Sequence, residues 1–280
     1  MMVGIDRADV EELIQMAISE DIGSGDVTSL AIFSDTHMSR AAILSKGSGI
    51  FCGGDIIRHV YGIVEQRVIV NQIIQDGVMI HPGDVIAELE GPTTGILAGE
   101  RITLNFLQRL CGIATKTRRL VALASGTDIM ILDTRKTVPG FRKLDKYAVR
   151  CGSGRNHRMG LYDMVMIKDN HITAAGGISR AVAMVRGVYG SRFTIEVEAS
   201  NPNEAKEAAE CGVDIIMLDN MDSSAIRDSI EVIKQRAKIE VSGNMDETRL
   251  LELINLEIDY VSIGSLTHSV DAFDLSMKFE

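Results

Sequence analysis

DMVMIKDN, residues 163–170, is a short apolar run that ends in charged and polar side chains. The same pattern recurs in DIMILDTRK from residue 128, FTIEVEAS from 193, DIIMLDN from 214, KIEVSGN from 238 and YVSIGSL from 260. Helical stretches such as NPNEAKEAAECG, with Asn201 as N-cap and Pro202 at the first helical position, fill several gaps. Strands that alternate with helices predict βαβ units, and six of them with polar ends indicate a closed or nearly closed α/β barrel.

The polar strand ends form a candidate active site, because barrel enzymes carry their catalytic groups at the C-terminal ends of the strands. These ends contain Asp133, Arg135, Lys136, Lys168, Asp169, Asn170, Glu196, Glu198, Asp219, Asn220, Ser242, Gly243, Asn244, Gly264 and Ser265. The Lys and Arg side chains suit phosphates or carboxylates. Glu198 and Asp219 suit sugar hydroxyls or a Mg²⁺ held through water, and the small residues at the last two ends suit a phosphate. The set predicts a phosphorylated sugar and a second anionic substrate.

The first half of the chain predicts a small α+β domain. Apolar residues at helical spacing predict a helix over about residues 8–19, and EDIGSGDVTS, residues 20–29, predicts a loop. From about 40 to 90 the pattern is strand-like, with a turn at HPGD, residues 81–84. Residues 99–124 predict one or two helices, in which Gly112 marks a break or a close contact. We place the domain boundary near residue 112.

Composition and charge disfavour several classes of function. The 280 residues are 45% hydrophobic and 24% charged, which is ordinary for a globular protein. The net charge of −10 disfavours a nucleic-acid partner, although residues 133–171 carry nine Lys or Arg against four Asp. This basic segment suits a small polyanionic ligand, with a solvated basic face as the alternative. No apolar run approaches the roughly 18 residues that span a bilayer, and the start lacks a signal-peptide pattern, so we expect a cytoplasmic protein without a membrane partner.

Single residues carry little weight by themselves. The four cysteines are far apart and form no CxxC pair, which argues against a zinc site or a disulfide framework. SGN at 242–244 can be a plain turn, Asp219 can cap a helix, and His157 can be a structural histidine. His171 is equally ambiguous and stays outside the predicted site. No GxSxG, P-loop or GxGxxG motif is present, which leaves acyl hydrolase, P-loop and Rossmann functions without support.

Several stretches resemble quinolinate phosphoribosyltransferase, also called carboxylating nicotinate-nucleotide pyrophosphorylase. They are EDIGSGDVTS, GERITLNFLQRLCGIAT, ILDTRKTVPGFRKLDKYAVRCGSGRNHRMGLYDMVMIKDNHI, IEVEAS, IIMLDN, VSGN and SIGSLTHS. The match runs over nearly the whole chain in collinear order, and the long central stretch is highly specific. One departure is Ser153, where we expect a glycine in a GGG-like run.

The resemblance implies a fold and a reaction. The expected fold is an N-terminal α/β sandwich domain, residues 1–112, and a seven-stranded α/β barrel, residues 113–266, with a C-terminal tail, about 267–280, that returns to the first domain. Only six strand-like runs follow residue 125, so we expect the missing strand near YAVRC, residues 147–151. The expected reaction converts quinolinate and phosphoribosyl pyrophosphate, with Mg²⁺, to nicotinate mononucleotide, pyrophosphate and CO₂ in NAD biosynthesis.

The resemblance also implies roles for individual residues. Arg101 in GERITLN matches an arginine that enters the active site of the partner subunit, which implies a homodimer and leaves open whether dimers assemble further. The family's positions for the two quinolinate carboxylates match Arg135, His157 and Arg158. Its catalytic positions match Lys136 and Lys168, at the pyrophosphate end and the substrate junction, and the acids Glu198 and Asp219, near the ribose and Mg²⁺. Its 5′-phosphate cradle matches Ser242, Gly243, Asn244 and Gly264.

Four other functions are alternatives. A molybdenum-transport-associated paralogue shares the fold, but KDNHI after the MVMI run favours the quinolinate enzyme. A nicotinate phosphoribosyltransferase would leave some of the three cationic groups unused, because its substrate has a single carboxylate. A non-catalytic binding protein would need the phosphate cradle but not Glu198 and Asp219. A Schiff-base aldolase using Lys168 would need an apolar pocket around that lysine, and the neighbouring residues are polar.

Overall fold

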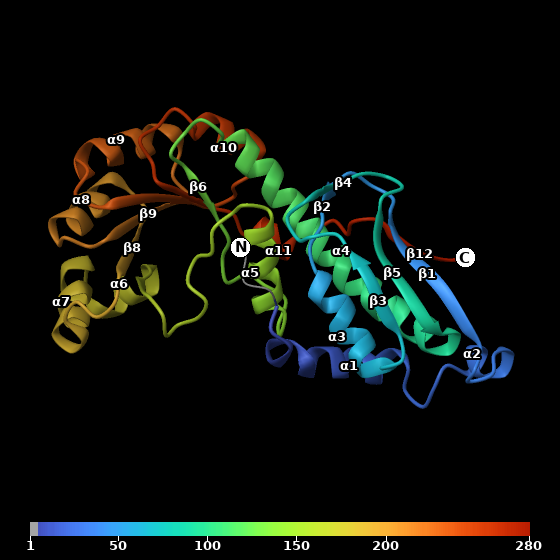
Figure 1. The fold of residues 1–280 in the computed structure, drawn as a ribbon. Coiled ribbons are helices and arrows are strands. Elements are labelled where there is room, and N and C mark those ends of the chain that lie inside the picture. The colour runs from blue at the N-terminus through green and yellow to red at the C-terminus, as the bar shows by residue number, and fades with distance from the viewer. Residues whose placement is uncertain (1–4) are drawn as a thin grey trace. The chain divides into compact units, whose positions relative to one another are not determined.

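The computed structural model describes residues 5–280, which form two compact units (Figure 1). Unit 1 contains residues 5–118, Val138–Ser153 and Ser269–Glu280. Unit 2 contains Arg119–Thr137 and Gly154–His268. The predicted strand-end residues belong to unit 2, and Arg101 belongs to unit 1.

Unit 1 is built on a four-stranded antiparallel sheet. Its strands lie in the order β12 (Leu275–Phe279), β1 (Met38–Ser45), β5 (Val85–Pro92) and β3 (Ile69–Ile73). A two-stranded sheet pairs β2 (Gly49–Ile50) with β4 (Met79–Ile80). The predicted turn at residues 81–84 is confirmed, because Gly83 has φ +94° and the backbone N–H of His81 donates to Asp84 Oδ2 at 2.8 Å.

Helices accompany these sheets: a 3₁₀ turn (Arg7–Asp9), α1 (Glu11–Asp21), α2 (Val27–Ile32), α3 (Gly54–Val64), α4 (Thr93–Leu123) and α5 (Arg142–Cys151). The 3₁₀ turn and α1 confirm the helix predicted over residues 8–19. The loop predicted over residues 20–29 is wrong at its end. Asp26 accepts hydrogen bonds from the backbone N–H groups of Thr28 and Ser29, and this N-cap starts α2.

Helix α3 lies in the segment predicted to be strand-like. Its buried residues follow helical spacing and are Ile56, Ile57, Val60 and Tyr61. The Tyr61 hydroxyl donates to Ile96 O of α4 at 3.1 Å, and a Cβ at Gly99 would lie 2.6 Å from the Tyr61 ring. The absence of a side chain at Gly99 therefore allows α3 to pack closely against α4.

Helix α4 continues through Gly112 without a break, so the predicted close contact at this glycine is confirmed. A Cβ at Gly112 would lie 2.2 Å from Asp271 O. One turn earlier, Gln108 Nε2 donates to Leu275 O at 3.3 Å, and the backbone N–H of Phe273 donates to Gln108 O at 2.9 Å. These contacts hold the C-terminal segment against α4 where it enters β12.

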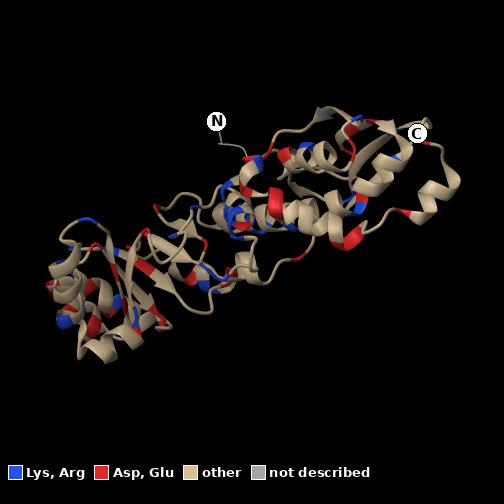
Figure 2. Ribbon diagram, turned by 90° about the horizontal axis from the view of Figure 1, so that it is seen from below, with Lys and Arg blue, Asp and Glu red and all other residues tan. Residues whose placement is uncertain are grey.

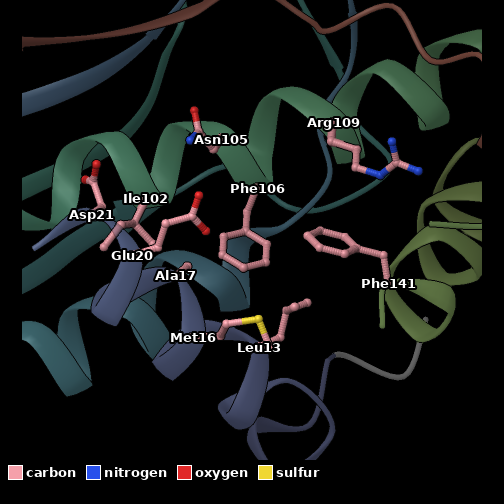
Figure 3. A pocket seen from close by; sticks show the side chains of 10 residues that line it. All are labelled: Leu13, Met16, Ala17, Glu20, Asp21, Ile102, Asn105, Phe106, Arg109 and Phe141. Atoms are coloured by element: carbon pink, nitrogen blue, oxygen red, sulfur yellow. The ribbon is translucent and has the colours of Figure 1, made fainter. Parts of the chain in front are cut away.

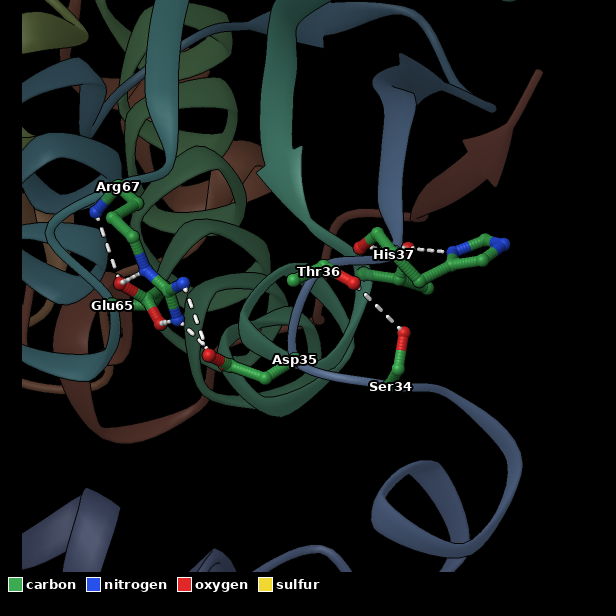
Figure 4. Close-up of polar contacts among 7 residues, drawn as sticks. Ser34, Asp35, Thr36, His37, Glu65 and Arg67 are labelled. Carbon is green, nitrogen blue, oxygen red and sulfur yellow. Dashed lines mark hydrogen bonds and ion pairs between the residues drawn. The ribbon is translucent and has the colours of Figure 1, made fainter.

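Polar side chains fix the segment that joins α2 to β1 (Figure 4). Arg67 Nη2 lies 2.7 Å from Asp35 Oδ1 and 2.7 Å from Glu65 Oε2. The hydrogen bonds from Arg67 lower the pKa values of both carboxyl groups. His37 Nδ1 lies 2.7 Å from Thr93 Oγ1, which ties the start of β1 to the start of α4. This corner of unit 1 thus relies on charge-assisted hydrogen bonds.

Unit 2 is a six-stranded parallel sheet with helices between its strands (Figure 1). The strands lie in the order β6 (Met130–Leu132), β11 (Tyr260–Ser262), β10 (Lys238–Ser242), β9 (Ile215–Asp219), β8 (Ile195–Ala199) and β7 (Val165–Ile167). The helices are α6 (Asp169–Ala175), α7 (Ile178–Tyr189), α8 (Pro202–Glu210), α9 (Ser223–Ile233), α10 (Glu247–Leu253) and α11 (Ser265–His268). All six predicted strand runs are confirmed. The Asn201 side chain caps α8 as predicted, by accepting from the backbone N–H groups of Asn203 and Glu204.

The strand expected near residues 147–151 is wrong, because these residues belong to α5. Most of α5 is buried, including Tyr147, Ala148, Val149 and Cys151. A single parallel bridge joins Leu132 of β6 to Arg155, where a seventh strand would begin. Within residues 5–280 the sheet therefore has six strands, with β6 and β7 at its edges.

The basic segment of the sequence is divided between the units. Arg142, Lys143, Lys146 and Arg150 lie on α5 of unit 1, whereas the other cations of residues 133–171 belong to unit 2. Across both units Lys and Arg lie among Asp and Glu (Figure 2). Among the helices formed by residues 5–280, none has the length and apolar content needed to cross a bilayer.

Candidate active site

The central strands of unit 2 place acidic side chains on one side of the sheet. Residues that alternate along a strand, or that are partners on neighbouring parallel strands, face the same side. Glu198 of β8, Met217 of β9 and Glu240 of β10 are partners in register, as are Asp219 and Ser242. Glu196, Glu198, Asp219 and Glu240 therefore lie on the same side of the sheet. Asp219 and Ser242 are the last residues of their strands.

Two arginines are brought together after β6 and before β7. The half-buried Arg158 donates through Nη1 to Met164 O at 3.2 Å, and its Nη2 lies 3.5 Å from Met166 Sδ. Burial lowers the pKa of Arg158, and the positive charge of Arg135 lowers it further. Two guanidinium groups that repel each other in a partly buried place suit an anionic ligand, which would relieve the repulsion.

The buried carboxylate of Asp133 holds the loop that carries His157 and Arg158. Asp133 Oδ2 accepts from Asn156 Nδ2 at 2.6 Å, and Oδ1 accepts from the backbone N–H of His157 at 2.8 Å. The backbone N–H of Arg158 in turn donates to His157 Nδ1 at 2.7 Å. The loop therefore starts from a fixed point at the end of β6, next to Arg135.

The other side of the His157 ring faces two buried glutamates. His157 Nε2 lies 3.1 Å from Glu196 Oε2 and 3.5 Å from Glu240 Oε2, and both carboxyl groups are buried. Burial raises the pKa of Glu196 to about 7. Burial, followed by the charge of Glu196, raises the pKa of Glu240 to about 8. Near neutral pH the pair therefore retains a proton, because two adjacent buried carboxylates cannot both ionise cheaply.

Lys168 and Glu198 form an ion pair at the ends of β7 and β8. Lys168 Nζ lies 2.8 Å from Glu198 Oε2, and both side chains are partly exposed. The backbone N–H of Lys168 donates to His171 Nδ1 at 3.0 Å, so the His171 ring caps the start of α6. The structure therefore gives the ambiguous His171 a capping role.

Small residues at the end of β10 allow a close approach to β9. Gly243 has φ +97°, and a Cβ there would lie 2.3 Å from Asn220 Oδ1 and 2.8 Å from Asn220 N. Asn220 Nδ2 donates to Asp219 Oδ2 at 2.6 Å, and the backbone N–H of Asn220 donates to Ser242 O at 3.0 Å. Asn244 has φ +47°, and its Nδ2 donates to Asn220 Oδ1 at 3.4 Å. The predicted SGN cradle thus packs directly on the Asp219–Asn220 turn.

Gly264 lies beside Lys136 at the next strand end. A Cβ at Gly264 would lie 3.0 Å from Lys136 Cδ and 3.1 Å from His268 Cδ2. The Thr267 hydroxyl donates to Lys136 O at 2.8 Å, which anchors the loop after β6 to α11. The exposed Lys136 and the small Gly264 are therefore neighbours, as a phosphate site needs.

Arg101 is exposed on α4 of unit 1, whereas the strand-end residues belong to unit 2. The residues after it, Ile102 and Asn105, help to line a cavity of about 270 Å³ between α1, α4 and the start of α5 (Figure 3). Phe106 and Phe141 stack across this cavity with ring centroids 5.6 Å apart. Neither Arg101 nor any other predicted site residue is among the described residues that line this cavity.

Two clusters bring three potential metal ligands within 4.8 Å of one another among residues 5–280. One consists of Cys52, Asp76 and Cys151 in unit 1, and the other of His157, Glu196 and Glu240. The first is occupied by protein, because Asp76 accepts from the backbone N–H groups of Gly53 and Gly54 and from the Tyr147 hydroxyl.

Sequence reasoning missed the structural roles of Asp133 and Glu240. Both sit next to, or within, an apolar run, in ILD at 131–133 and in IEV at 239–241. For Glu240 the available signal was an acidic residue between two β-branched apolar residues, Ile239 and Val241, whereas Asp133 only follows Leu132 at the end of its run. Only the fold could show that these acids meet the 156–158 loop.

Comparison with known proteins gives a consistent result. The protein-family model of the quinolinate phosphoribosyl transferase N-terminal domain matches residues 26–111. The family model of the C-terminal domain matches residues 113–278. A probable carboxylating nicotinate-nucleotide pyrophosphorylase of Bacillus subtilis is 43% identical over 268 residues, which cover 96% of this chain and 92% of the relative.

Solved structures are similar over almost the whole chain. NadC from Streptococcus pyogenes superposes with a TM-score of 0.95 and 39% identity, and covers 99% of this chain and 98% of its own. The nicotinate-nucleotide pyrophosphorylase of Francisella tularensis superposes with a TM-score of 0.93 and 35% identity, at 99% and 98% coverage.

Proposed function

Because the chain belongs to the quinolinate phosphoribosyl transferase family, we propose that it makes nicotinate mononucleotide from quinolinate and phosphoribosyl pyrophosphate, with release of pyrophosphate and CO₂. The observation that carries the proposal is the order of charges along one end of the unit 2 sheet. Arg158 contacts the edge strand β7, Glu198 and Asp219 lie on β8 and β9, and the glycines 243 and 264 follow β10 and β11. Arg135 follows β6 at the other edge of the sheet, and its charge acts on Arg158. This order matches a dicarboxylate, a ribose and a phosphate. The proposed reaction is a step of NAD biosynthesis.

The cations select quinolinate over a monocarboxylate. Arg135 and Arg158 repel each other, and one dianionic ring neutralises both. Lys168 is held by Glu198 at the junction between the ring site and the ribose site. A nicotinate ring carries a single carboxylate, which can pair with only one of the two guanidinium groups.

The reaction needs positioning and charge stabilisation more than a nucleophilic side chain. The ring nitrogen forms a bond to the anomeric carbon as the bond to pyrophosphate breaks, and positive charge develops on the ribose. Glu198 and Asp219 stabilise that charge, and Lys136 stabilises the leaving pyrophosphate. The resulting pyridinium accepts the electron pair of the adjacent carbon–carboxylate bond, CO₂ leaves, and the ring carbon takes up a proton.

Mg²⁺ is the proposed cofactor. The carboxylates of Glu198 and Asp219 suit it, because hard oxygen ligands and retained waters are typical of Mg²⁺ sites. Glu198 Oε2 is occupied by Lys168 and Asp219 Oδ2 by Asn220, so we propose that these residues hold the ion through water. When bound, the ion would neutralise charge on the pyrophosphate.

We also propose a homodimer in which Arg101 completes the active site of the partner. Arg101 is exposed on helix α4, which belongs to unit 1, whereas the strand ends belong to unit 2. Its charged side chain is therefore available to a second subunit. Mixing Arg101→Ala and Lys136→Ala proteins tests this. Random dimers would regain about a quarter of wild-type activity, because half are mixed and each mixed dimer has one intact site. No recovery after subunit exchange would exclude a shared site.

All four cysteines of the chain are free thiols, and three of them are buried. Free thiols are typical of reducing compartments, and we propose a cytoplasmic location on this ground.

A product assay tests the proposed reaction. The protein is incubated with phosphoribosyl pyrophosphate and Mg²⁺ and with either quinolinate or nicotinate, and nicotinate mononucleotide is measured. Formation of product with quinolinate but not with nicotinate supports the proposal. No product, or equal product from nicotinate, rejects it.

A further inference from the structure

Two buried glutamates next to the active site have no part in the reaction as described above. Glu196 of β8 and Glu240 of β10 have no exposed surface, and strand β9 lies between them in the sheet. Within residues 5–280 none of their four carboxyl oxygens has a well-directed hydrogen bond. Burying carboxyl groups is costly unless another group compensates for the lost water. Apolar side chains could fill the same space at lower cost, so the pair needs an explanation.

The His157 ring lies against both carboxyl groups. Its Nε2 lies 3.1 Å from Glu196 Oε2 and 3.5 Å from Glu240 Oε2, so the ring bridges two strands that are not neighbours. The ring itself is nearly buried, with 7% of the side chain exposed. A nearly buried ring between two carboxyl groups has little freedom to turn toward a ligand.

The opposite edge of the ring faces the protein as well. His157 Nδ1 accepts from the backbone N–H of Arg158 at 2.7 Å. The backbone N–H of His157 donates to Asp133 Oδ1 at 2.8 Å. Two carboxyl groups from strands β8 and β10 and a third that directly follows β6 therefore determine the position of His157, and His157 determines where Arg158 begins.

We propose that Glu196 and Glu240 are positioning residues: they hold the His157 ring, and the ring holds the Arg158 backbone so that the guanidinium is ready for a quinolinate carboxylate. The effect of His157 on quinolinate binding then passes through Arg158. The Arg158 guanidinium is supported separately by Met164 O, which sets its direction once the backbone is in place. The proposal rests on the proposed function, because it concerns the site assigned to quinolinate.

Steady-state kinetics of four variants test the proposal. In Glu196→Leu and Glu240→Leu the KM for quinolinate rises at least tenfold, whereas the KM for phosphoribosyl pyrophosphate stays within twofold. Glu196→Gln and Glu240→Gln keep an oxygen that can accept from His157 Nε2, and their quinolinate KM stays within about threefold. Asp145→Leu is the matched control, because Asp145 is a buried acid paired with Arg109 at 2.8 Å in unit 1. It lowers the melting temperature without a selective effect on quinolinate.

A double-mutant cycle shows whether the effect passes through His157. Glu240→Leu raises the quinolinate KM in the wild-type background. In a His157→Gln background the same substitution changes this KM less than twofold, because the ring that Glu240 holds is gone. If Glu240→Leu does not fold, Glu240→Asp withdraws the carboxyl by one methylene and takes its place in the cycle. Additive effects, or equal changes in both KM values, would overturn the proposal.

Two further outcomes are decisive. The cluster also has the spacing of a cation site, so Mn²⁺ binding that is present in the wild type and lost in Glu240→Leu would overturn the positioning role. A wild-type protein that does not turn over quinolinate would refute the proposed function. A wild type that does, with unchanged KM values in the Leu variants, would refute this inference alone.

Discussion

Gly243→Ala is expected to damage the phosphate end of the active site. The new Cβ would lie 2.3 Å from Asn220 Oδ1, 2.6 Å from Asn220 Cγ and 2.8 Å from Asn220 N. The side chain of Asn220 could turn away, but its backbone nitrogen could not, because it donates to Ser242 O of the neighbouring strand β10 at 3.0 Å. The methyl group must therefore separate the end of β10 from the end of β9.

The size of the effect follows from two terms. A residue with a side chain at φ +97° costs about 1–3 kcal/mol in backbone strain, and overpacking at a tight contact costs about 1–3 kcal/mol more. We expect the free energy of unfolding to fall by about 2–5 kcal/mol. Moving Asn220 also moves Asp219, to which it donates at 2.6 Å, so the site for ribose and 5′-phosphate changes shape.

The assay is steady-state kinetics with each substrate varied in turn, together with thermal unfolding. We expect the KM for phosphoribosyl pyrophosphate to rise at least tenfold, and the KM for quinolinate to change less than threefold. Gly187→Ala is the matched control in the same unit, because α7 is helical there and a Cβ would meet nothing within 4 Å. Alanine should raise stability there by about 0.5–1 kcal/mol. A Gly243→Ala enzyme with an unchanged KM for phosphoribosyl pyrophosphate would refute the reasoning.

Three other variants test separate parts of the site. Lys168→Met removes the cation paired with Glu198, and kcat/KM is expected to fall at least 100-fold, as is usual when one preorganised charge is lost; a fall below tenfold would contradict the assignment. Asp133→Asn replaces one accepting oxygen by an NH2 group, which then opposes either the backbone N–H of His157 or Asn156 Nδ2, so thermal unfolding should show a loss of about 2 kcal/mol, and an unchanged melting temperature would contradict the anchoring role. The pKa of Glu240 is raised in the folded state to about 8, so its contribution to stability is complete below about pH 4.5 and is lost as the pH rises through 8. Glu240→Gln removes this loss, and its melting temperature relative to wild type should increase from pH 6 to pH 9; a constant difference would contradict the raised pKa.

The sheet of unit 2 could be predicted because its strands are buried on both faces. Such strands are continuous apolar runs, as in IIMLD of β9, and their polar ends stand out. The candidate residues at these ends were found for the same reason. His157 and Arg158 required the resemblance, since they lie in a loop that no periodicity describes.

The helices of unit 1 were harder to predict. The buried face of α3 has helical spacing, but the residue that caps it is distant in sequence: Asp76 accepts from the backbone N–H groups of Gly53 and Gly54 at 2.9 Å. No local signal marks that start. Segment 147–151 contains β-favouring residues, yet it is helical because the burial of α5 within unit 1 outweighs intrinsic preference.

Ser153 shows what a departure from a family pattern can mean physically. Its φ of +72° lies in the region that favours glycine, which explains why a glycine was expected there. The serine hydroxyl accepts from Arg118 Nη2 at 3.0 Å, and this hydrogen bond offsets part of the strain. The sequence alone could identify the position but not the compensation.

Release of CO₂ from quinolinate labelled in the carboxyl group next to the ring nitrogen tests the central claim most directly. If phosphoribosyl transfer and decarboxylation occur in one site, labelled CO₂ and nicotinate mononucleotide appear in equal amounts, and no CO₂ appears without phosphoribosyl pyrophosphate. Labelled CO₂ without phosphoribosyl pyrophosphate, or transfer without CO₂, would contradict the account.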